Sequence, residues 1–556
     1  MASSTPYSDA AQGPRPEPGP RTELGPRREP GPSAELGPSA ESGWLTWLAR
    51  IIPAITAFAV ADYGISRPSL WRDEAYTIVA ASRSPAQIFD LLRHSDAVHG
   101  AYYLCMHVVI ATFGRAETAV RLPSAVATAI TAGLIAALGT RLVSRSGGRW
   151  PQVFGLLAGL LYGVAPFATR YAQEARSYAT VAGLAIFATY ALVRALEDDR
   201  RGWWACYAIA IAAIGHFNLF GLLILPAHAV TVLMARPRGR SPGGEFSRSD
   251  AALAAPPHVR RWIIAVASAA VLLVPVAVGA YLERADTAWL GQPGLRALGK
   301  LALSFAGSRM LQLPVGALVV IATCAGLAAV GRRRFTTTTV CLPWLVLPPA
   351  TLLAAAQIHP VYNVRYVVFC LPAVALLAAD GLSWLTRFTA EFVSPPAPAA
   401  VALLPAFAIV VLVAVAAVAP QQALRNPESR PDNLRKVSEI ITRHARPGDA
   451  VLYITSHSRI VSQGYPGPFR KLRDVALAES PVASATLNGT EVGEAVLRRR
   501  FTAVRRVWVI SDNGRRLPHA LDRLDAEKLA LVKGLRRLAR WHTSKDLLLL
   551  YERSPA

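Results

Sequence analysis

The acidic pair Asp73–Glu74 follows the first long apolar segment almost immediately and opens a helical pattern that runs through Ile78 and Val79. A carboxylate at the water-facing edge of a membrane can act as a general base on an acceptor hydroxyl, an effect typically worth about 10²- to 10⁴-fold in rate. The pair can also simply cap the helix, because free backbone N–H groups and the helix dipole favour acidic side chains there. Both interpretations place the pair at a helix N-terminus.

Three further clusters combine charged, imidazole and phenolic side chains within short segments. They are His94/Asp96/His99, the segment 170–178 (RYAQEARSY) and the segment 359–366 (HPVYNVRY). Histidine and aspartate are common metal ligands, but the 94/96/99 spacing matches no motif of fixed geometry, so we expect polar loop residues rather than a metal site. The sequence predicts no cofactor and leaves a divalent metal open.

The composition assigns these clusters to a membrane protein. Hydrophobic residues make up 53% of the 556 residues and charged residues only 17%, with a mean hydropathy of +0.32. The net charge of +23 would suggest a nucleic-acid partner in a soluble chain, but many of the basic residues lie in short joints between apolar segments. There they set orientation in the membrane. The five cysteines show neither CxxC pairs nor metal-ligand spacing, which argues against a disulfide framework and a zinc site.

Eleven apolar segments are candidate membrane spans, because roughly 17 to 25 apolar residues in a helix cross the hydrocarbon core. They cover residues 45–63, 121–142, 151–168, 178–197, 203–215, 219–235, 262–282, 313–331, 338–356, 365–386 and 397–418. The apolar segment 101–113 is too short to span, so we interpret it as an interfacial or re-entrant helix. The predicted fold class is a polytopic α-helical membrane protein.

The basic joints orient these spans. With the N-terminus in the cytoplasm, the arginines at 141–149, 194–201, 236–261 and 332–334 all fall on the cytoplasmic side, as the positive-inside rule requires. The acidic pair, the histidine cluster and the segments 170–178 and 359–366 then share the outer face. Charged residues at a membrane boundary are costly unless they are paired or hydrated, so their convergence predicts one functional site there.

The two ends of the chain differ from the spans. Residues 1–43 repeat Gly-Pro and contain few large apolar residues, which predicts a disordered cytoplasmic tail. Residues 420–556 predict a small extracytoplasmic α/β domain: VLYIT (451–455) and RVWVI (506–510) are typical of buried strands, and a helix from near Asp432 ends before Pro447-Gly448. The membrane domain between them covers 44–419, with 64–120 as its first outer loop.

Several ordered motifs carry a resemblance to a known family. They are WxDEAY (71–76), HGAYYLxxH (99–107), FGxxExxxRLPS (113–124) and RYAQEARSY (170–178), which follow the first span in this order. Over roughly residues 45 to 390, the chain resembles the GT-C glycosyltransferases that use polyprenyl-phosphate sugars, such as protein O-mannosyltransferases and the lipid A aminoarabinose transferase. The resemblance implies that Asp73, with Glu74 beside it, supplies the catalytic carboxylate. His99 and Tyr103 of the second motif become candidate substrate-binding residues.

A polyprenyl phosphate leaving group gains negative charge as the sugar bond breaks, so fixed cations are needed near the membrane surface. Arg365 and Arg176 are the candidates, because the planar guanidinium can donate two hydrogen bonds to a phosphate at once. Each arginine can instead be an interfacial anchor. Tyr362 and Tyr366 can flank the substrate or belong to an aromatic belt. Glu174, between two arginines, can bind substrate or hold an arginine in position.

These observations predict an inverting glycosyltransferase in a bacterial plasma membrane, with Asp73 as the general base. Its partners would be a polyprenyl-phosphate sugar, with mannose or arabinose as the sugar, an envelope glycan, lipid or protein as the acceptor, and the bilayer. A transporter or lipid flippase is the alternative. Transporters commonly place ionisable residues near the bilayer midplane and show paired repeats, and this sequence shows neither feature. A catalytically inactive relative that binds glycan or protein through its outer domain is the third possibility.

Overall fold

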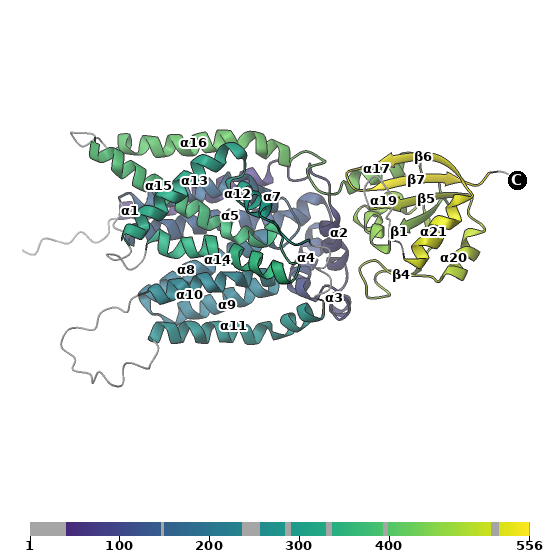
Figure 1. The fold of residues 1–556 in the computed structure, drawn as a ribbon, viewed down its shortest axis with the longest axis horizontal. Helices are drawn as coiled ribbons and strands as arrows, with labels where there is room; N and C mark the ends of the chain where they lie inside the picture. Colours follow the sequence, from purple (N-terminus) through teal and green to yellow (C-terminus); the bar gives the residue numbers. More distant parts are fainter. Residues whose placement is uncertain are drawn as a thin grey trace, which may run out of the picture. The chain divides into compact units, whose positions relative to one another are not determined.

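The computed structural model describes residues 40–145, 149–235, 256–283, 291–329, 336–392, 399–512 and 522–554. Most of the predicted disordered tail, residues 1–43, lies outside the described residues. The remaining chain forms a helical membrane part and a C-terminal part that contains a β-sheet (Figure 1).

In the described residues, the membrane part consists of α-helices with three short 3-10 helices. These are α1 (Ala40–Asp62), α2 (Arg72–Ala81), α3 (Pro85–Leu92), η1 (Ala97–His99), α4 (Gly100–Phe113), α5 (Glu117–Arg145), α6 (Pro151–Gly163), α7 (Pro166–Ala172), α8 (Tyr178–Asp198), α9 (Arg201–Phe217), η2 (Leu219–Leu223), α10 (Ile224–Met234), α11 (Pro257–Leu282), α12 (Arg296–Ala306), α13 (Arg309–Ala329), α14 (Thr337–Ile358), η4 (Val364–Cys370), α15 (Leu371–Phe392) and α16 (Ala399–Leu424).

Each of the eleven predicted spans coincides with helix in the described part of the chain. Within the described ranges, eight helices are long and apolar enough to cross a membrane: α1, α5, α8, α11, α13, α14, η4 together with α15, and α16. The predicted span 151–168 is the pair α6 and α7, which are bent by 62° at a break before Pro166. Proline cannot continue the helical hydrogen-bond pattern, which accounts for the break. The predicted spans 203–215 and 219–235 are the shorter α9 and η2–α10.

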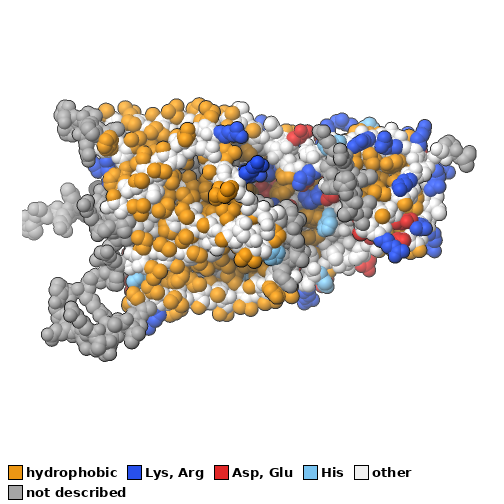
Figure 2. Space-filling model, in the orientation of Figure 1, with side chains coloured by type: hydrophobic (Ala, Val, Ile, Leu, Met, Phe, Trp, Pro, Cys, Tyr) orange, Lys and Arg blue, Asp and Glu red, His pale blue; other side chains and the backbone are white. Residues whose placement is uncertain are grey.

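Apolar side chains cover the outside of this helical part. Figure 2 shows them over most of the helices in view, with few charged side chains among them. Large exposed apolar residues include Ile55 of α1, Val271 of α11, Val320 of α13 and Leu412 of α16. Exposed apolar surface on this scale would be unfavourable in water but is favourable against lipid tails. The molecule is therefore a multi-span membrane protein.

The helix α5 connects two polar regions at its opposite ends. Its first turn carries Glu117, which accepts a hydrogen bond from Arg435 of the C-terminal part at 2.6 Å. Its last turn carries Arg145, which pairs with Glu197 of α8 at 3.0 Å. Arg141 pairs with the same glutamate. Because a 29-residue helix is about 44 Å long, these two regions lie at opposite ends of a helix that is long enough to cross a bilayer. Part of the basic set predicted to face the cytoplasm therefore lies at the end remote from Glu117.

The C-terminal part is an α/β unit, as expected. Its helices are α17 (Leu434–His444), η5 (Ser456–Arg459), α18 (Ile460–Gly464), α19 (Pro466–Phe469), α20 (Glu494–Phe501) and α21 (Arg523–Lys533), and its strands are β1 (Ala450–Ile454), β2 (Arg473–Asp474), β3 (Leu477–Glu479), β4 (Thr490–Glu491), β5 (Arg506–Ser511), β6 (Arg536–His542) and β7 (Leu547–Glu552). Five strands form one sheet in the order β2-β1-β5-β7-β6, in which β1 is parallel to β2 and β5, and β7 is antiparallel to β5 and β6.

The two strands predicted from apolar runs are the buried centre of this sheet. All five residues of β1 are buried, as are five of the six residues of β5. A parallel pair buried on both faces explains why these segments are continuously apolar rather than alternating. The predicted helix near Asp432 is α17, whose N-cap Asn433 accepts a hydrogen bond from the backbone of Lys436 at 3.1 Å.

Close packing of α5 against α6 generates a first prediction. A Cβ atom on Gly155 would lie 2.5 Å from the Ala136 carbonyl oxygen and 2.9 Å from the Thr140 backbone nitrogen. Gly155→Ala is therefore expected to destabilise the protein by about 1–3 kcal/mol through overpacking. Thermal unfolding in detergent measures the effect. Gly202→Ala in α9 is the control, because a Cβ there meets nothing within 4 Å; equal melting temperatures for both variants would contradict the prediction.

Candidate active site

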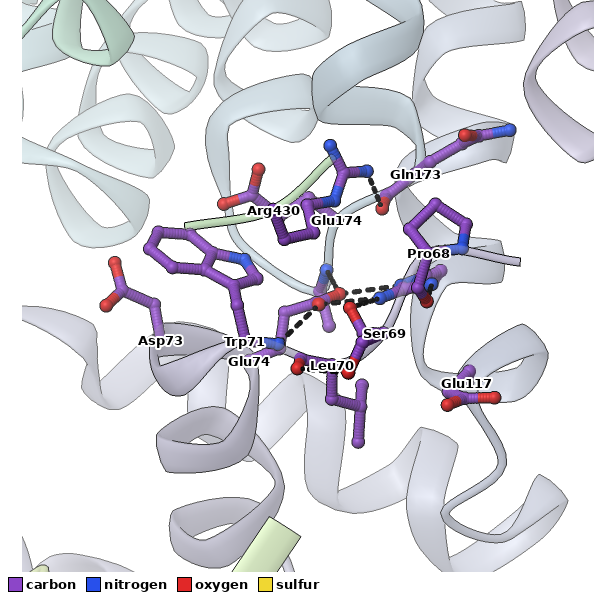
Figure 3. Close-up of polar contacts among 12 residues, drawn as sticks. Pro68, Ser69, Leu70, Trp71, Asp73, Glu74, Glu117, Gln173, Glu174 and Arg430 are labelled. Carbon is purple, nitrogen blue, oxygen red and sulfur yellow. Dashed lines mark hydrogen bonds and ion pairs between the residues drawn. The ribbon is translucent and has the colours of Figure 1, made fainter. Parts of the chain in front are cut away.

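The short helix α2 places the acidic pair. It begins after an extended Trp71, whose backbone N–H donates to the Glu74 side chain at 3.4 Å. Both acidic residues lie in the first turn, where the helix dipole favours negative charge. The predicted helix N-terminus is therefore present, and the neighbouring carboxylates leave it in different directions (Figure 3).

The Asp73 side chain contacts an arginine that lies much later in the sequence of the membrane part. Arg365 donates from Nη1 to Asp73 Oδ2 at 2.7 Å, and the Asp73 side chain keeps 23% of its surface exposed. The two residues are 292 positions apart in the sequence. The structure thus brings together the first and the last of the predicted polar clusters.

Aromatic rings surround the Arg365 guanidinium. Its Cζ atom lies 5.8 Å from the ring centroids of Trp71 and Tyr178 and 5.5 Å from that of Tyr366. Tyr366 in turn stacks on Phe220, with centroids 4.3 Å apart. Such rings attract a cation through their quadrupoles and restrict its movement. Tyr366 therefore contacts the arginine of the site, whereas Tyr362 lies in the preceding loop with a buried hydroxyl that makes no hydrogen bond to any described residue.

Glu74 differs from its neighbour because its side chain is completely buried. Arg121 donates to it twice, from Nε to Oε1 and from Nη2 to Oε2, both at 2.7 Å. The backbone N–H of Ala175 adds a third hydrogen bond at 2.9 Å. Burial opposes ionisation of Glu74, but the Arg121 guanidinium outweighs it and holds the pKa of Glu74 below its usual value.

Arg121 extends this contact to the chain segment that leads into α2. Its remaining N–H groups donate to the backbone oxygens of Ile65, Pro68 and Ser69 at 2.7, 2.9 and 3.0 Å. Five hydrogen bonds to one buried guanidinium hold the segment and the helix together. Sequence reasoning did not assign a role to Arg121, although it is the arginine of the FGxxExxxRLPS motif.

Arg176 belongs to a second chain of polar contacts. Its Nη2 donates to His99 Nε2 at 2.7 Å, and His99 Nδ1 lies 2.6 Å from Asp96 Oδ1. Because arginine can only donate, the imidazole accepts at Nε2 and donates at Nδ1 to Asp96. Tyr103 donates its hydroxyl proton to the other oxygen of Asp96. His99 thus contacts Arg176 directly, and Tyr103 is linked to it through Asp96. Arg176 also donates to Thr77 of α2 at 3.5 Å.

The neighbours of Asp96 favour its ionised form. Burial would raise the pKa of Asp96, but His99 and Arg176 outweigh it and hold that pKa below its usual value. The backbone of Asp96 adopts a left-handed conformation with φ of 64°, which aspartate tolerates better than most residues. The third member of the predicted cluster, His94, instead bonds to the backbone oxygen of Asp90 at 2.9 Å. Within the described ranges, no three His, Cys, Asp or Glu side chains are grouped so that they could hold a metal ion.

Glu174 is buried beside the site, and its nearest ion-pair partner is Arg170 at 3.8 Å. Burial raises the pKa of Glu174 above its usual value. Arg430, which follows α16, faces the same space; it donates from Nη2 to the Gln173 backbone oxygen at 2.8 Å (Figure 3). Burial and the neighbouring Arg170 lower the pKa of Arg430 to about 9. Sequence reasoning missed Arg430, which no local pattern distinguishes from other arginines of the C-terminal part.

The buried Glu74–Arg121 pair generates a second prediction. Glu74→Gln preserves the shape of the side chain but leaves a buried guanidinium without its charge partner, which is expected to destabilise the protein by about 3–5 kcal/mol. The melting temperature in detergent and the yield of folded protein measure this. Glu439→Gln on the exposed face of α17 serves as the control, because its side chain is 44% exposed. A Glu74→Gln variant as stable as the wild type would refute the assignment.

The chain is similar to known proteins both in sequence and in fold. Residues 101–243 match the model of a family described as dolichyl-phosphate-mannose-protein mannosyltransferase. Among solved structures, ArnT from Cupriavidus metallidurans in the apo state is similar, with a TM-score of 0.56 and 15% identity over 92% of this chain and 98% of that chain. ArnT from the same organism bound to undecaprenyl phosphate gives a TM-score of 0.54 and 14% identity over the same shares.

A search of curated proteins finds no match to this sequence. The likeness to ArnT extends over nearly the whole of both chains, so the two share a fold despite their low identity. The resemblance to glycosyltransferases that use polyprenyl-phosphate sugars, predicted from the sequence motifs, is thereby confirmed. The chain has the same fold as ArnT.

Proposed function

We propose that the protein transfers a sugar from a polyprenyl-phosphate donor to an acceptor hydroxyl, with Asp73 as the general base. The main support for this proposal is the difference in solvent exposure among the three carboxylates of the site. Asp73 is partly exposed and adjoins an arginine, whereas the Glu74 side chain is fully buried between hydrogen-bond donors and Glu174 is almost completely buried. A base must reach the hydroxyl that it deprotonates, so Asp73 is the base and Glu74 is a positioning residue.

Arg365 links the base to the leaving group in this proposal. The donor phosphate competes with Asp73 for the Arg365 guanidinium, whose Nε has no hydrogen-bond partner among the described residues. As the phosphate takes over this contact, Asp73 becomes more basic and the arginine neutralises the charge that develops on the leaving oxygen. Arg176 is more deeply buried and hydrogen-bonded to His99. It therefore adds positive charge near the phosphate without contacting it directly.

The reaction is a single displacement. The acceptor oxygen forms a bond to C1 of the sugar while its proton passes to Asp73, and the bond between C1 and the phosphate oxygen breaks with its electron pair on the phosphate. One displacement inverts the configuration at C1. The accepting side is proposed to be the outer face of a bacterial plasma membrane, with the N-terminus inside and the C-terminal part outside.

An apolar groove offers a place for the polyprenyl chain. It is lined by residues such as Pro166, Phe305, Leu371 and Val413. A row of edge-to-face rings leads from it toward the arginine: Phe305 to Phe167 at 6.0 Å, Phe167 to Tyr171 at 5.2 Å and Tyr171 to Tyr178 at 5.3 Å between centroids. Tyr178 then faces Arg365. An apolar tail and a charged head would therefore bind at adjacent places, as a lipid phosphate requires.

Release of free polyprenyl phosphate tests the proposal. Membranes that contain the wild type or Asp73→Asn are given polyprenyl-phosphate mannose and polyprenyl-phosphate arabinose separately, together with a membrane extract as acceptor. Asp73→Asn is expected to release the lipid phosphate about 10²- to 10⁴-fold more slowly because the base is lost. Asp90→Asn in α3, with a side chain 53% exposed, is the matched control and should match the wild type.

Each outcome has a clear meaning. Release by the wild type and the control but not by Asp73→Asn supports the proposal, and the donor that reacts identifies the sugar. Undiminished release by a folded Asp73→Asn protein would remove Asp73 as the base. Transport of the lipid across the membrane without release of the sugar would favour a flippase.

A further inference from the structure

The helix α2 lies between two bodies, each of which contacts a different face of it. Asp73, Glu74 and Thr77 bond to Arg365, Arg121 and Arg176 of the membrane part. The other face, which carries Arg72, Ala75, Tyr76 and Val79 and continues to Arg83 just beyond the helix, packs against the C-terminal part. Positions spaced three or four residues apart share one side of a helix, which is why neighbouring residues point to different bodies.

Arg72 makes the strongest of these contacts with the C-terminal part. Its guanidinium faces three carboxylates, Asp432 at 3.9 Å, Asp546 at 3.7 Å and Asp512 in direct contact. They come from the segment before α17, the turn between β6 and β7 and the end of β5. The side chains of Asp546 and Asp432 are 0% and 3% exposed, so this cation is the principal partner of a largely buried acidic group. The backbone N–H of Arg72 also donates to Asp432 Oδ2 at 3.2 Å.

The rest of α2 is held from the same side. Arg83 donates from Nη2 to the backbone oxygens of Pro481 at 2.9 Å and Thr486 at 2.5 Å. Tyr76 donates its hydroxyl proton to Asn488 at 3.3 Å. Ala75 belongs to the same buried apolar cluster as residues of α17 and β1. The helix is thus fixed at its start, its middle and its end by the C-terminal part.

The segment that enters α2 is also held by the C-terminal part. Tyr465 accepts a hydrogen bond from the backbone of Leu70 at 3.1 Å and donates its own proton to Glu117. Arg435 donates to the same glutamate at 2.6 Å and to the backbone oxygen of Ser66 at 2.7 Å. The base therefore stands on a helix whose position depends on two separate sets of contacts.

We propose that the C-terminal part is a positioning element of the catalytic centre and that Arg72, clamped by three aspartates, is its principal positioning residue. This inference rests on the proposed function of Asp73. Asp73 is adjacent to Arg72, so a shift of α2 moves the base relative to Arg365 and to the acceptor hydroxyl. A misplacement of about 1 Å at a reacting group can lower a rate about 10²-fold without a change in the chemistry available. The C-terminal part would thus act on turnover rather than on donor binding.

The test uses the full-length protein with Arg72→Ala, Arg72→Lys and the milder Asp512→Asn. Amide hydrogen exchange of residues 72–81 reports the clamp without any need for activity. Arg72→Ala is expected to exchange there at least about 10-fold faster and to lower kcat about 10²-fold, with KM for the polyprenyl-phosphate sugar within about twofold. Arg72→Lys keeps the charge and should recover part of both losses, and Asp512→Asn should show a smaller change in the same direction. Arg93→Ala, whose side chain is 77% exposed, is the matched control.

The outcomes separate the two proposals. Unchanged exchange of residues 72–81 in both Arg72→Ala and Asp512→Asn would overturn the clamp whatever their activity. Faster exchange with an unchanged kcat would show that the clamp does not position the base. If Arg72→Ala does not fold, Asp512→Asn decides by the same two readouts. Retained activity in Asp73→Asn would remove Asp73 as the base, while the exchange data would still decide whether Arg72 holds α2.

Discussion

The buried ion pair between Glu74 and Arg121 is the contact on which the arrangement of the site depends. It joins the first turn of α2 to the beginning of α5, and through Arg121 to the backbone oxygens of residues 65–69. Two charges removed from water are tolerated only if both are fully hydrogen-bonded, and here the guanidinium and the carboxylate meet this condition. This pair therefore holds the entry of the chain into α2 from the side of the membrane part, and Asp73 is the residue directly before Glu74.

The charge of Asp73 is balanced by an arginine that is 292 positions away in the sequence. Arg365 lies against it, inside a ring of Trp71, Tyr178 and Tyr366 that restricts the guanidinium without neutralising it. An arginine held by aromatic faces keeps N–H groups available for another anion, which a fully hydrogen-bonded arginine such as Arg121 does not. The two arginines near the acidic pair therefore differ in their surroundings: Arg121 holds the backbone, whereas Arg365 keeps the N–H groups that the proposed function assigns to the donor phosphate.

The membrane and C-terminal parts contribute to the site in different ways. The membrane part carries the charged side chains and, beside them, an apolar groove suited to a lipid tail. The C-terminal part contributes three aspartates that face Arg72: Asp432 from the segment before α17, Asp512 just after β5 and Asp546 from the turn between β6 and β7. The contacts of this part with α2 favour a role in bracing that helix. A polar site between lipid and water needs such support, because neither solvent can hold a short helix in one orientation.

The sequence by itself determined the class of fold, the positions of the helices and the acidic pair that contains the proposed base. Apolar length predicts spans because a bilayer has a set thickness, and the continuous apolar runs at 451–455 and 506–510 predict central strands, which are β1 and β5. The tertiary structure alone decided which carboxylate is exposed, since Asp73 and Glu74 are equivalent in local sequence and differ only in what packs on each side of α2. It also decided the partners: Arg365, Arg121 and the three aspartates lie between 47 and 474 residues from α2 along the chain, and periodicity reports only neighbours within a few turns.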